Sequence, residues 1–247
     1  MSKNKLAKFS EMETFEHVVQ TPYNKIEKDN FYLKGNWGKD FFKNSNPIIL
    51  ELGCGKGEYT VALAEKNPDF NYIGVDIKGA RLYNGAKESF NKGLKNVGFL
   101  RTNIEIISQF FGHNEITEIW LTFPDPQMKK TRKRLTSTTF LNRYKTLLKN
   151  DGIVHLKTDS NFQYTYTREM VYLNQFEILA ETDNLYESNI LNEILEVKTF
   201  YEKQWLSRGI KIKYIAFKLS DKEFEEPEID IEKDEYRSFG RSAGDVH

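Results

Sequence analysis

The chain has little cysteine, little histidine and no excess of charge of either sign. Its 247 residues include one cysteine, Cys54, and four histidines that are scattered along the sequence. A single cysteine excludes a disulfide framework and a cysteine-based zinc site, and the histidines form no cluster that predicts a metal site. Basic and acidic side chains are equal in number, at 36 each. This balance excludes a uniformly basic coat for nucleic acid but leaves room for a local basic patch.

Long apolar segments are also absent. No run approaches the roughly 18 apolar residues of a membrane-spanning helix, and the first residues contain no apolar signal-peptide core. With 39% hydrophobic residues, the chain can still bury a sizeable core, which excludes wholesale disorder. We therefore expect a cytoplasmic protein of one or two domains, with no membrane partner and no metal. The sequence leaves open whether it is a monomer or a homodimer.

Charge is unevenly distributed along the chain. Residues 221–247 hold ten acidic and four basic residues, a net charge of −6, so residues 1–220 carry +6. Because this acidic tail has few apolar residues, we expect a flexible or loosely docked extension. Residues 129–149 hold eight basic residues and no acidic one. We expect an N-terminal extension (1–45), a single domain (46–220) and the acidic C-terminal tail (221–247).

Short apolar runs alternate with segments of helical spacing. The predicted strands are 48–52, 72–75, 97–100, 118–122, 152–157, 177–181 and 212–219. The predicted helices are 58–66, 78–92, 104–111, 136–149, 162–173 and 200–207. This alternation predicts an α/β fold with a mostly parallel seven-stranded sheet and helices on both faces. Ligands of such sheets bind at the carboxyl ends of the strands, where the unusual residues of this chain occur.

A glycine-rich loop follows the first predicted strand. The segment ELGCGKG, residues 51–57, places glycines at 53, 55 and 57. The third glycine comes one residue earlier than in the GxGxxG dinucleotide motif, and Glu51 stands two residues before the first. A carboxylate suits a cofactor with an ammonium and a sulfonium better than a pyrophosphate. The loop resembles the S-adenosylmethionine loop of Rossmann-like methyltransferases; the alternative is an ordinary glycine turn after a buried strand.

Two further polar residues follow the next predicted strands. Asp76 ends the second strand, where an acid accepts hydrogen bonds from both ribose hydroxyls of a nucleoside cofactor. The alternative is a helix N-cap. Asn103 follows the third strand and offers a carbonyl acceptor for the amino group of an adenine. It is equally suited to cap the helix predicted at 104–111, and the two roles can coexist.

The fourth predicted strand ends at the sequence Phe-Pro-Asp-Pro. Two prolines around Asp125 preset the backbone and aim the carboxylate at the position where Rossmann-like methyltransferases hold the group that is methylated. The alternative is a plain proline-rich turn. The basic run 129–134 follows directly, which suggests a track for a phosphate backbone, although such runs often form only a solvated surface.

Two later segments leave their roles open. Asp159 follows the fifth predicted strand, where it either caps the next helix or binds the edge of a base together with Asp125. Residues 199–202 have the T-x-x-E form of a helix capping box, and this structural interpretation is sufficient for the segment taken alone.

In combination, the motifs resemble the tRNA (guanine-N7-)-methyltransferase family, bacterial enzymes that methylate guanine 46 in the variable loop of tRNA. The resemblance runs from about Leu33 to Leu219 and rests on ELGCGKGE, YIGVDIKGAR, FPDP followed by KK, HLKTD and TFYEKQW, in the family's order. It implies a Rossmann-like class I S-adenosylmethionine-dependent methyltransferase that transfers methyl to N7 of a tRNA guanine. Gln127 and Met128 stand where the family commonly has Trp-Pro, and the basic segment is about two residues shorter, so the loop over the target base differs.

The resemblance also implies roles for single residues. The cofactor would be bound by Glu51, Gly53, Gly55, Gly57, Asp76, Asn103 and Asp125. Asp125 would also be the catalytic residue. The tRNA or its guanine would contact Lys129, Asp159, Thr199, Tyr201 and Glu202. Two other functions remain as alternatives, a methyltransferase of a small molecule or protein and a non-catalytic cofactor-binding RNA chaperone. The intact Asp125 beside three intact glycines argues against the chaperone.

Overall fold

An eight-stranded sheet forms the centre of the computed structural model, which describes residues 3–21 and 31–238. Its strand order is β1-β4-β3-β2-β5-β6-β8-β7. The strands are β1 (Val18–Gln20), β2 (Ile48–Leu52), β3 (Asn71–Asp76), β4 (Val97–Arg101), β5 (Ile116–Thr122), β6 (Leu148–Thr158), β7 (Glu177–Thr182) and β8 (Lys213–Lys218). Neighbours from β1 to β6 are parallel, and only β8 runs antiparallel to both β6 and β7. The predicted α/β fold with a mostly parallel sheet is confirmed.

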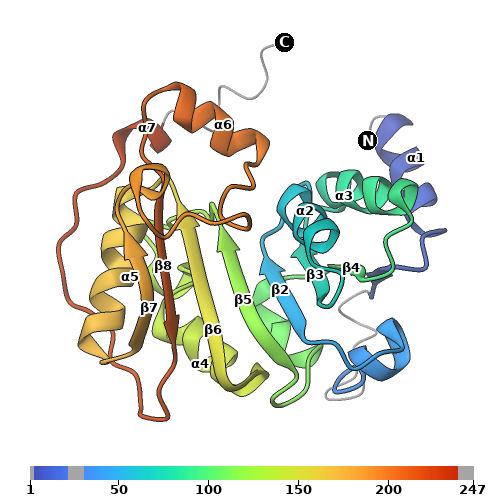
Figure 1. Cartoon of the computed structure of the whole chain (residues 1–247), viewed down its shortest axis with the longest axis horizontal. Helices are drawn as coiled ribbons and strands as arrows, with labels where there is room; N and C mark the ends of the chain where they lie inside the picture. Colours follow the sequence, from blue (N-terminus) through green and yellow to red (C-terminus); the bar gives the residue numbers. More distant parts are fainter. Residues whose placement is uncertain (1–2, 22–30, 239–247) are drawn as a thin grey trace.

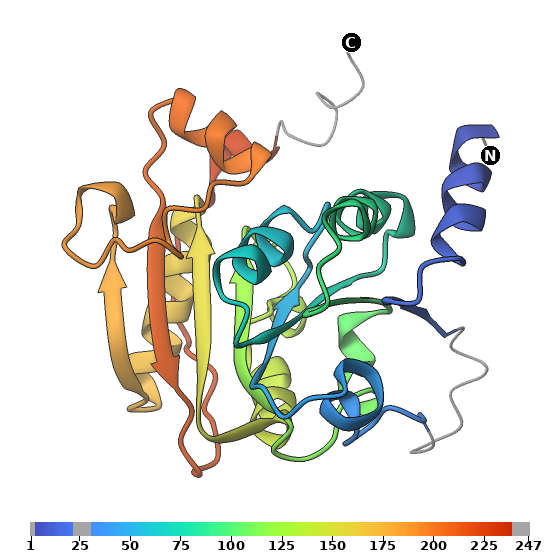
Figure 2. The same ribbon diagram turned by 45° about the vertical axis from the view of Figure 1, so that its right-hand side comes forward.

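Helices cover both faces of the sheet, as Figures 1 and 2 show. The helices are α1 (Lys3–Met12), α2 (Glu58–Lys66), α3 (Gly79–Lys92), α4 (Thr138–Leu147), α5 (Asn161–Leu173), α6 (Phe200–Ser207) and α7 (Glu235–Ser238). Apolar residues of α1, α2 and α3 form one core cluster, and those of α4 and α5 form the other. Within the described ranges, no helix is long and apolar enough to cross a membrane.

The sheet has one strand more than the sequence predicts. Strand β1 is only three residues long and pairs in parallel with β4, with Val18 opposite Phe99. Three residues are too few for an alternating pattern, so the seven-strand prediction is wrong by this edge strand. The residues before the first predicted strand also reach the core. The buried Trp37 lies in a π-helix, Trp37–Phe42, and its indole nitrogen donates to the carbonyl of Phe110 at 2.9 Å.

The acidic tail is held more tightly than its composition predicts. From the end of β8 the chain runs along the outer side of the molecule to α7 at the upper edge of Figure 1. The Glu226 carboxylate accepts from the backbone nitrogen of Thr138 at 3.1 Å, in the first turn of α4, and from the Tyr166 hydroxyl. Asp234 is buried at the first turn of α5. Helix N-termini attract negative charge. The first turns of α4 and α5 therefore hold two acidic residues of the tail, and the sequence of the tail alone does not reveal these partners.

Candidate functional site

The carboxyl ends of five adjacent parallel strands lie at one edge of the sheet, the upper edge in Figure 1. The glycine loop follows β2, Asp76 ends β3 and Asn103 follows β4. The Phe-Pro-Asp-Pro segment follows β5, and Asp159 follows β6. The topology therefore brings the predicted residues of all five strand ends to the same edge.

The three glycines of the loop have different surroundings. All three have left-handed backbones, with φ of +81° at Gly53, +58° at Gly55 and +71° at Gly57. Apart from the adjoining residues, a Cβ placed on Gly53 or Gly55 would come no closer than 4.0 Å to another atom, so neither position is crowded. A Cβ on Gly57 would lie 2.7 Å from the Phe99 ring and 3.1 Å from the Cα of Gly85 in α3. Gly53 and Gly55 thus form an open cradle, whereas Gly57 permits the close packing of α2 and α3.

Glu51 is buried beneath this cradle. One carboxylate oxygen accepts from the backbone nitrogen of Thr60 at 2.9 Å and from its hydroxyl, and the other accepts from the hydroxyl of Thr122. Burial raises the pKa of Glu51 to about 7, although these hydrogen bonds oppose the shift. Glu51 therefore joins β2 to α2 and β5. Its oxygen beside Thr122 keeps acceptor capacity for one further donor.

Asp76 fixes the loop to the end of β3. One of its carboxylate oxygens accepts from the backbone nitrogen of Gly55 at 2.9 Å, and the other accepts from that of Lys78 at 2.7 Å. Because each carboxylate oxygen has two lone pairs, both can also accept from a ligand hydroxyl. The next residue, Ile77, is 58% exposed. No sequence motif marks Ile77 as a site residue, although an apolar residue directly after an acid at a strand end is a signal of this kind.

Asn103 has the capping role that the sequence left open. Its side-chain oxygen accepts from the backbone nitrogen of Glu105 at 3.0 Å and so caps the 3₁₀ helix Ile104–Gln109. A carbonyl oxygen has two lone pairs, so this bond leaves one for an adenine amino group.

The loop that carries Asp125 is rigid and strained. Phe123 and Gln127, which flank it, have left-handed backbones with φ of +51° and +47°. Such conformations are costly for residues other than glycine, and they concentrate at functional sites. Pro124 and Pro126 are buried, whereas the Asp125 side chain is exposed and accepts from the backbone nitrogen of Gln127 at 3.1 Å. The prolines thus fix the loop while the carboxylate reaches the surface.

The basic run after this loop divides into two parts. Lys129, Lys130, Arg132 and Lys133 are exposed. Arg134 is buried, and its guanidinium lies 4.8 Å from the ring centre of Phe162 and 4.4 Å from that of Tyr166. It also donates to the carbonyl of Met128 at 3.2 Å. Arg134 therefore holds the Asp125 loop against α5 and is not part of an exposed basic strip.

The predicted tRNA-contacting residues occupy different environments. Asp159 is 1% exposed and does not cap α5, because the N-cap is Ser160, whose hydroxyl accepts from the backbone nitrogen of Gln163 at 2.9 Å. Lys129 and Tyr201 are exposed. Thr199 and Glu202 form the predicted capping box at the start of α6, so that interpretation is confirmed.

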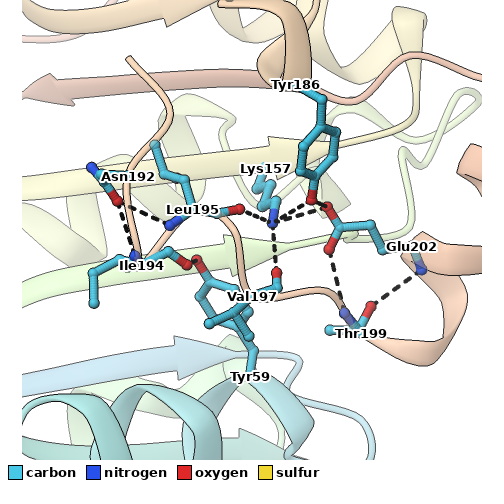
Figure 3. Close-up of polar contacts among 9 residues, drawn as sticks. All are labelled: Tyr59, Lys157, Tyr186, Asn192, Ile194, Leu195, Val197, Thr199 and Glu202. Carbon is cyan, nitrogen blue, oxygen red and sulfur yellow. Dashed lines mark hydrogen bonds and ion pairs between the residues drawn. The ribbon is translucent and has the colours of Figure 1, made fainter. Parts of the chain in front are cut away.

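Glu202 also belongs to a buried polar cluster (Figure 3). Its carboxylate lies 2.9 Å from the Nζ of Lys157 and accepts from the Tyr186 hydroxyl at 2.5 Å. Lys157 donates to the carbonyls of Leu195 and Val197, both at 2.8 Å. Burial lowers the pKa of Lys157, and the charge of Glu202 opposes that shift. This cluster joins the end of β6 to the segment that leads into α6.

Comparisons with known proteins agree with this arrangement. A family model described as "Putative methyltransferase" matches residues 45–215. A tRNA (guanine-N(7)-)-methyltransferase from Bacteroides fragilis is 56% identical over 243 residues, which are 98% of this chain and 96% of that protein. The chain belongs to the tRNA (guanine-N(7)-)-methyltransferase family. A second member, from Porphyromonas gingivalis, is 54% identical and covers 94% of this chain and 97% of its own length.

Solved structures extend the likeness at the level of the fold. An antibiotic-related methyltransferase superposes with a TM-score of 0.56 at 18% identity, covering 82% of this chain and 96% of its own. The 16S rRNA methyltransferase KamB gives 0.58 at 14% identity, with 74% and 92% covered. The resemblance read from the sequence motifs is confirmed at the level of the family and the fold class.

Proposed function

We propose that this chain transfers the methyl group of S-adenosylmethionine to N7 of guanine 46 in the variable loop of tRNA. The observation that carries the proposal is the similarity, over nearly the whole length of the chain, to relatives named tRNA (guanine-N(7)-)-methyltransferase. The carboxyl edge of the sheet supports it, because an open glycine cradle, an exposed carboxylate and a basic strip occur there together. With tRNA as the substrate, the activity belongs in the cytoplasm.

The residues at this edge fit the cofactor. The uncrowded positions of Gly53 and Gly55 allow a ligand to approach the backbone, and Asp76 retains acceptor capacity for two ribose hydroxyls. Ile77 offers an exposed apolar surface for the adenine, and Asn103 keeps a lone pair for the adenine amino group. We assign Glu51 to holding the loop from below. A cationic group of the cofactor near Glu51 would favour its charged form, against the effect of burial on its pKa.

We expect Asp76→Ala to weaken the binding of S-adenosylhomocysteine by about 1–3 kcal/mol, because ribose hydroxyls would lose a charged acceptor and Gly55 would lose its own. Titration calorimetry measures this change. NAD should not bind to the native protein, and tRNA affinity measured without cofactor serves as the control, since Asp76 lies on the cofactor side. Micromolar binding of NAD with no response to S-adenosylhomocysteine would contradict the cofactor assignment.

The cofactor supplies an electrophilic methyl group when it is bound. Guanine N7 has an in-plane lone pair and no proton, so the protein needs no strong base. Its task would be to hold the cofactor at Gly53, Gly55 and Asp76 and to bring guanine N7 next to the methyl group. The base becomes cationic as the methyl is transferred, and the exposed carboxylate of Asp125 stabilises that charge. Lys129 and Asp159 contribute to binding the tRNA and its guanine.

The exposed residues Lys130, Arg132 and Lys133 form the basic strip that we assign to tRNA phosphates. Replacing all three by alanine should weaken tRNA binding, and each lost phosphate contact should reduce the log–log salt slope by about 0.7–0.9. Filter binding across a salt series measures the slope. The matched control replaces three other exposed lysines, Lys39, Lys43 and Lys149. These line a cavity of about 630 Å³ together with Ile48, the first residue of β2, and therefore lie at the opposite end of that strand from the glycine loop. An unchanged slope in the strip variant would place the tRNA contact elsewhere.

Mass spectrometry of tRNA nucleosides tests the proposed reaction. Unmodified tRNA incubated with the protein and S-adenosylmethionine should gain N7-methylguanosine, and tRNA whose guanine 46 is replaced should not. Methyl transfer to a small molecule or protein, with none to tRNA, would instead favour the first alternative function. Cofactor and tRNA binding without any turnover would favour the chaperone.

A further inference from the structure

The C-terminal segment returns to the carboxyl edge of the sheet and contacts Asp159. Its last described helix, α7, lies next to α6 at the top of Figure 1. The hydroxyl of Tyr236, in α7, lies 3.0 Å from the backbone carbonyl oxygen of Asp159 and 3.0 Å from its carboxylate oxygen Oδ2. A tyrosine from the end of the chain thus touches a residue that the proposed function assigns to the guanine.

Tyr236 is held in this position from two sides. The buried carboxylate of Asp234 accepts from the backbone nitrogen of Phe162 at 3.1 Å and from the hydroxyl of Ser160, the N-cap of α5. The ring of Tyr236 packs edge-on against Trp205 in α6, with 5.4 Å between the ring centres. Tyr236 therefore connects the corner between β6 and α5 to the helix that begins with Thr199 and its capping box.

The burial of Asp159 explains why such a contact matters. A carboxylate that is 1% exposed requires hydrogen-bond donors, and the positions of those donors decide which way it points. The Tyr236 hydroxyl lies within hydrogen-bond distance of both the carbonyl oxygen and Oδ2 of Asp159. It therefore holds the carboxylate of Asp159 on the same side as the backbone carbonyl of that residue. The ammonium of Lys213 donates to the same carbonyl at 3.4 Å and so supports the backbone.

We propose that Tyr236 is a positioning residue for substrate recognition, which holds the Asp159 carboxylate in the orientation that binds the target guanine. This inference rests on the proposed function and adds a residue from the acidic tail to the tRNA side of the site. The tail is then a working part of the site, because Asp234 sets the place of Tyr236 and Tyr236 sets the direction of Asp159.

The variant Tyr236→Phe tests this inference, since it removes the hydroxyl and keeps the ring against Trp205. We expect kcat/KM for tRNA to fall about tenfold, mainly through a higher KM, as for the loss of one hydrogen bond to a charged group. S-adenosylhomocysteine affinity and Tm should stay close to those of the native protein. The matched control is Tyr172→Phe, which removes another tyrosine hydroxyl bonded to a carboxylate, that of Glu181 on β7 at 2.8 Å. It should methylate tRNA normally.

A double-variant cycle shows whether Tyr236 acts through Asp159. In an Asp159→Asn background, Tyr236→Phe should cause little further loss, because the orientation of the carboxylate no longer matters. The same tenfold loss in that background, or an equal loss in Tyr172→Phe, would overturn the inference. A native kcat/KM in Tyr236→Phe would also overturn the inference. A raised kcat/KM would overturn it as well, because it would mean that the tyrosine competes with guanine for Asp159. Failure of the native protein to methylate guanine N7 in tRNA would be a separate result, against the proposed function itself.

Discussion

Replacing Asp125 by asparagine is expected to lower turnover by about 10²–10³-fold and to change the KM for tRNA little. Asparagine keeps the size of the side chain and an oxygen that can accept from the backbone nitrogen of Gln127, so the loop should keep its shape. The charge is lost, however, and that charge interacts more strongly with the cationic product base than with neutral guanine. An interaction that strengthens as the methyl is transferred affects kcat rather than binding.

Steady-state kinetics with tRNA and cofactor at saturation measure this effect. Asp69→Asn is a matched control, because Asp69 is another exposed aspartate that directly follows a proline, in the turn between α2 and β3. It should be silent. If Asp125 only placed the base, the loss would appear in KM instead. A variant with native turnover would remove Asp125 from the catalytic role, since buried Pro124 and Pro126 would then be all that the loop requires.

Replacing Lys157 by methionine is expected to reduce the free energy of unfolding by about 3–5 kcal/mol. The side chains of Lys157 and Glu202 are both 0% exposed. Methionine fills a similar volume but leaves the Glu202 carboxylate buried without its cation, and it leaves the carbonyls of Leu195 and Val197 without a donor. Urea denaturation followed by circular dichroism measures the loss.

A second replacement distinguishes charge from packing. Lys157→Met combined with Glu202→Gln removes both charges and should recover much of the lost stability, because a neutral amide costs less to bury. The control is Lys92→Met, which breaks two exposed ion pairs, with Glu65 at 2.7 Å and with Glu88 at 2.8 Å, and should cost no more than about 1 kcal/mol. If Lys157→Met were as mild as Lys92→Met, the buried pair would contribute little to the stability of the fold.

The sequence correctly predicts strands and helices that have a clear hydrophobic period and are bounded by glycine or proline. The apolar run 48–52 and the helix 58–66 have the bounds that the structure gives to β2 and α2, because glycines separate them and their side-chain periods differ. Strand β1 has no such signal. Its three residues form a strand because the edge of β4 lies beside them, and that neighbour is about eighty positions away.

For the individual site residues too, the sequence predicts what depends on local signals and misses what depends on contacts between distant segments. The sequence places Asp76 and Asp125 at strand ends, where the structure has them, because the strands themselves are readable. It does not reveal that Arg134 turns away from the exposed basic strip, since the rings that hold it come from α5. Nor does it reveal the partner of Glu202, because Lys157 lies on a strand far earlier in the chain. Contacts between distant segments decide these cases, and composition and spacing do not encode them.

The order of the site along the chain has a consequence for protein synthesis. The cradle and its polar neighbours occupy residues 51–103, whereas the residues that we propose for the tRNA side extend from the loop at Asp125 to Tyr236. On the ribosome, the segments for the cofactor side are therefore synthesised before the loop at Asp125 and more than 130 residues before Tyr236. The contact between Tyr236 and Asp159 forms only after residue 236 has been synthesised. A prematurely released chain that ends before Asp234 would hold the cradle sequence intact but would lack the residues that orient Asp159.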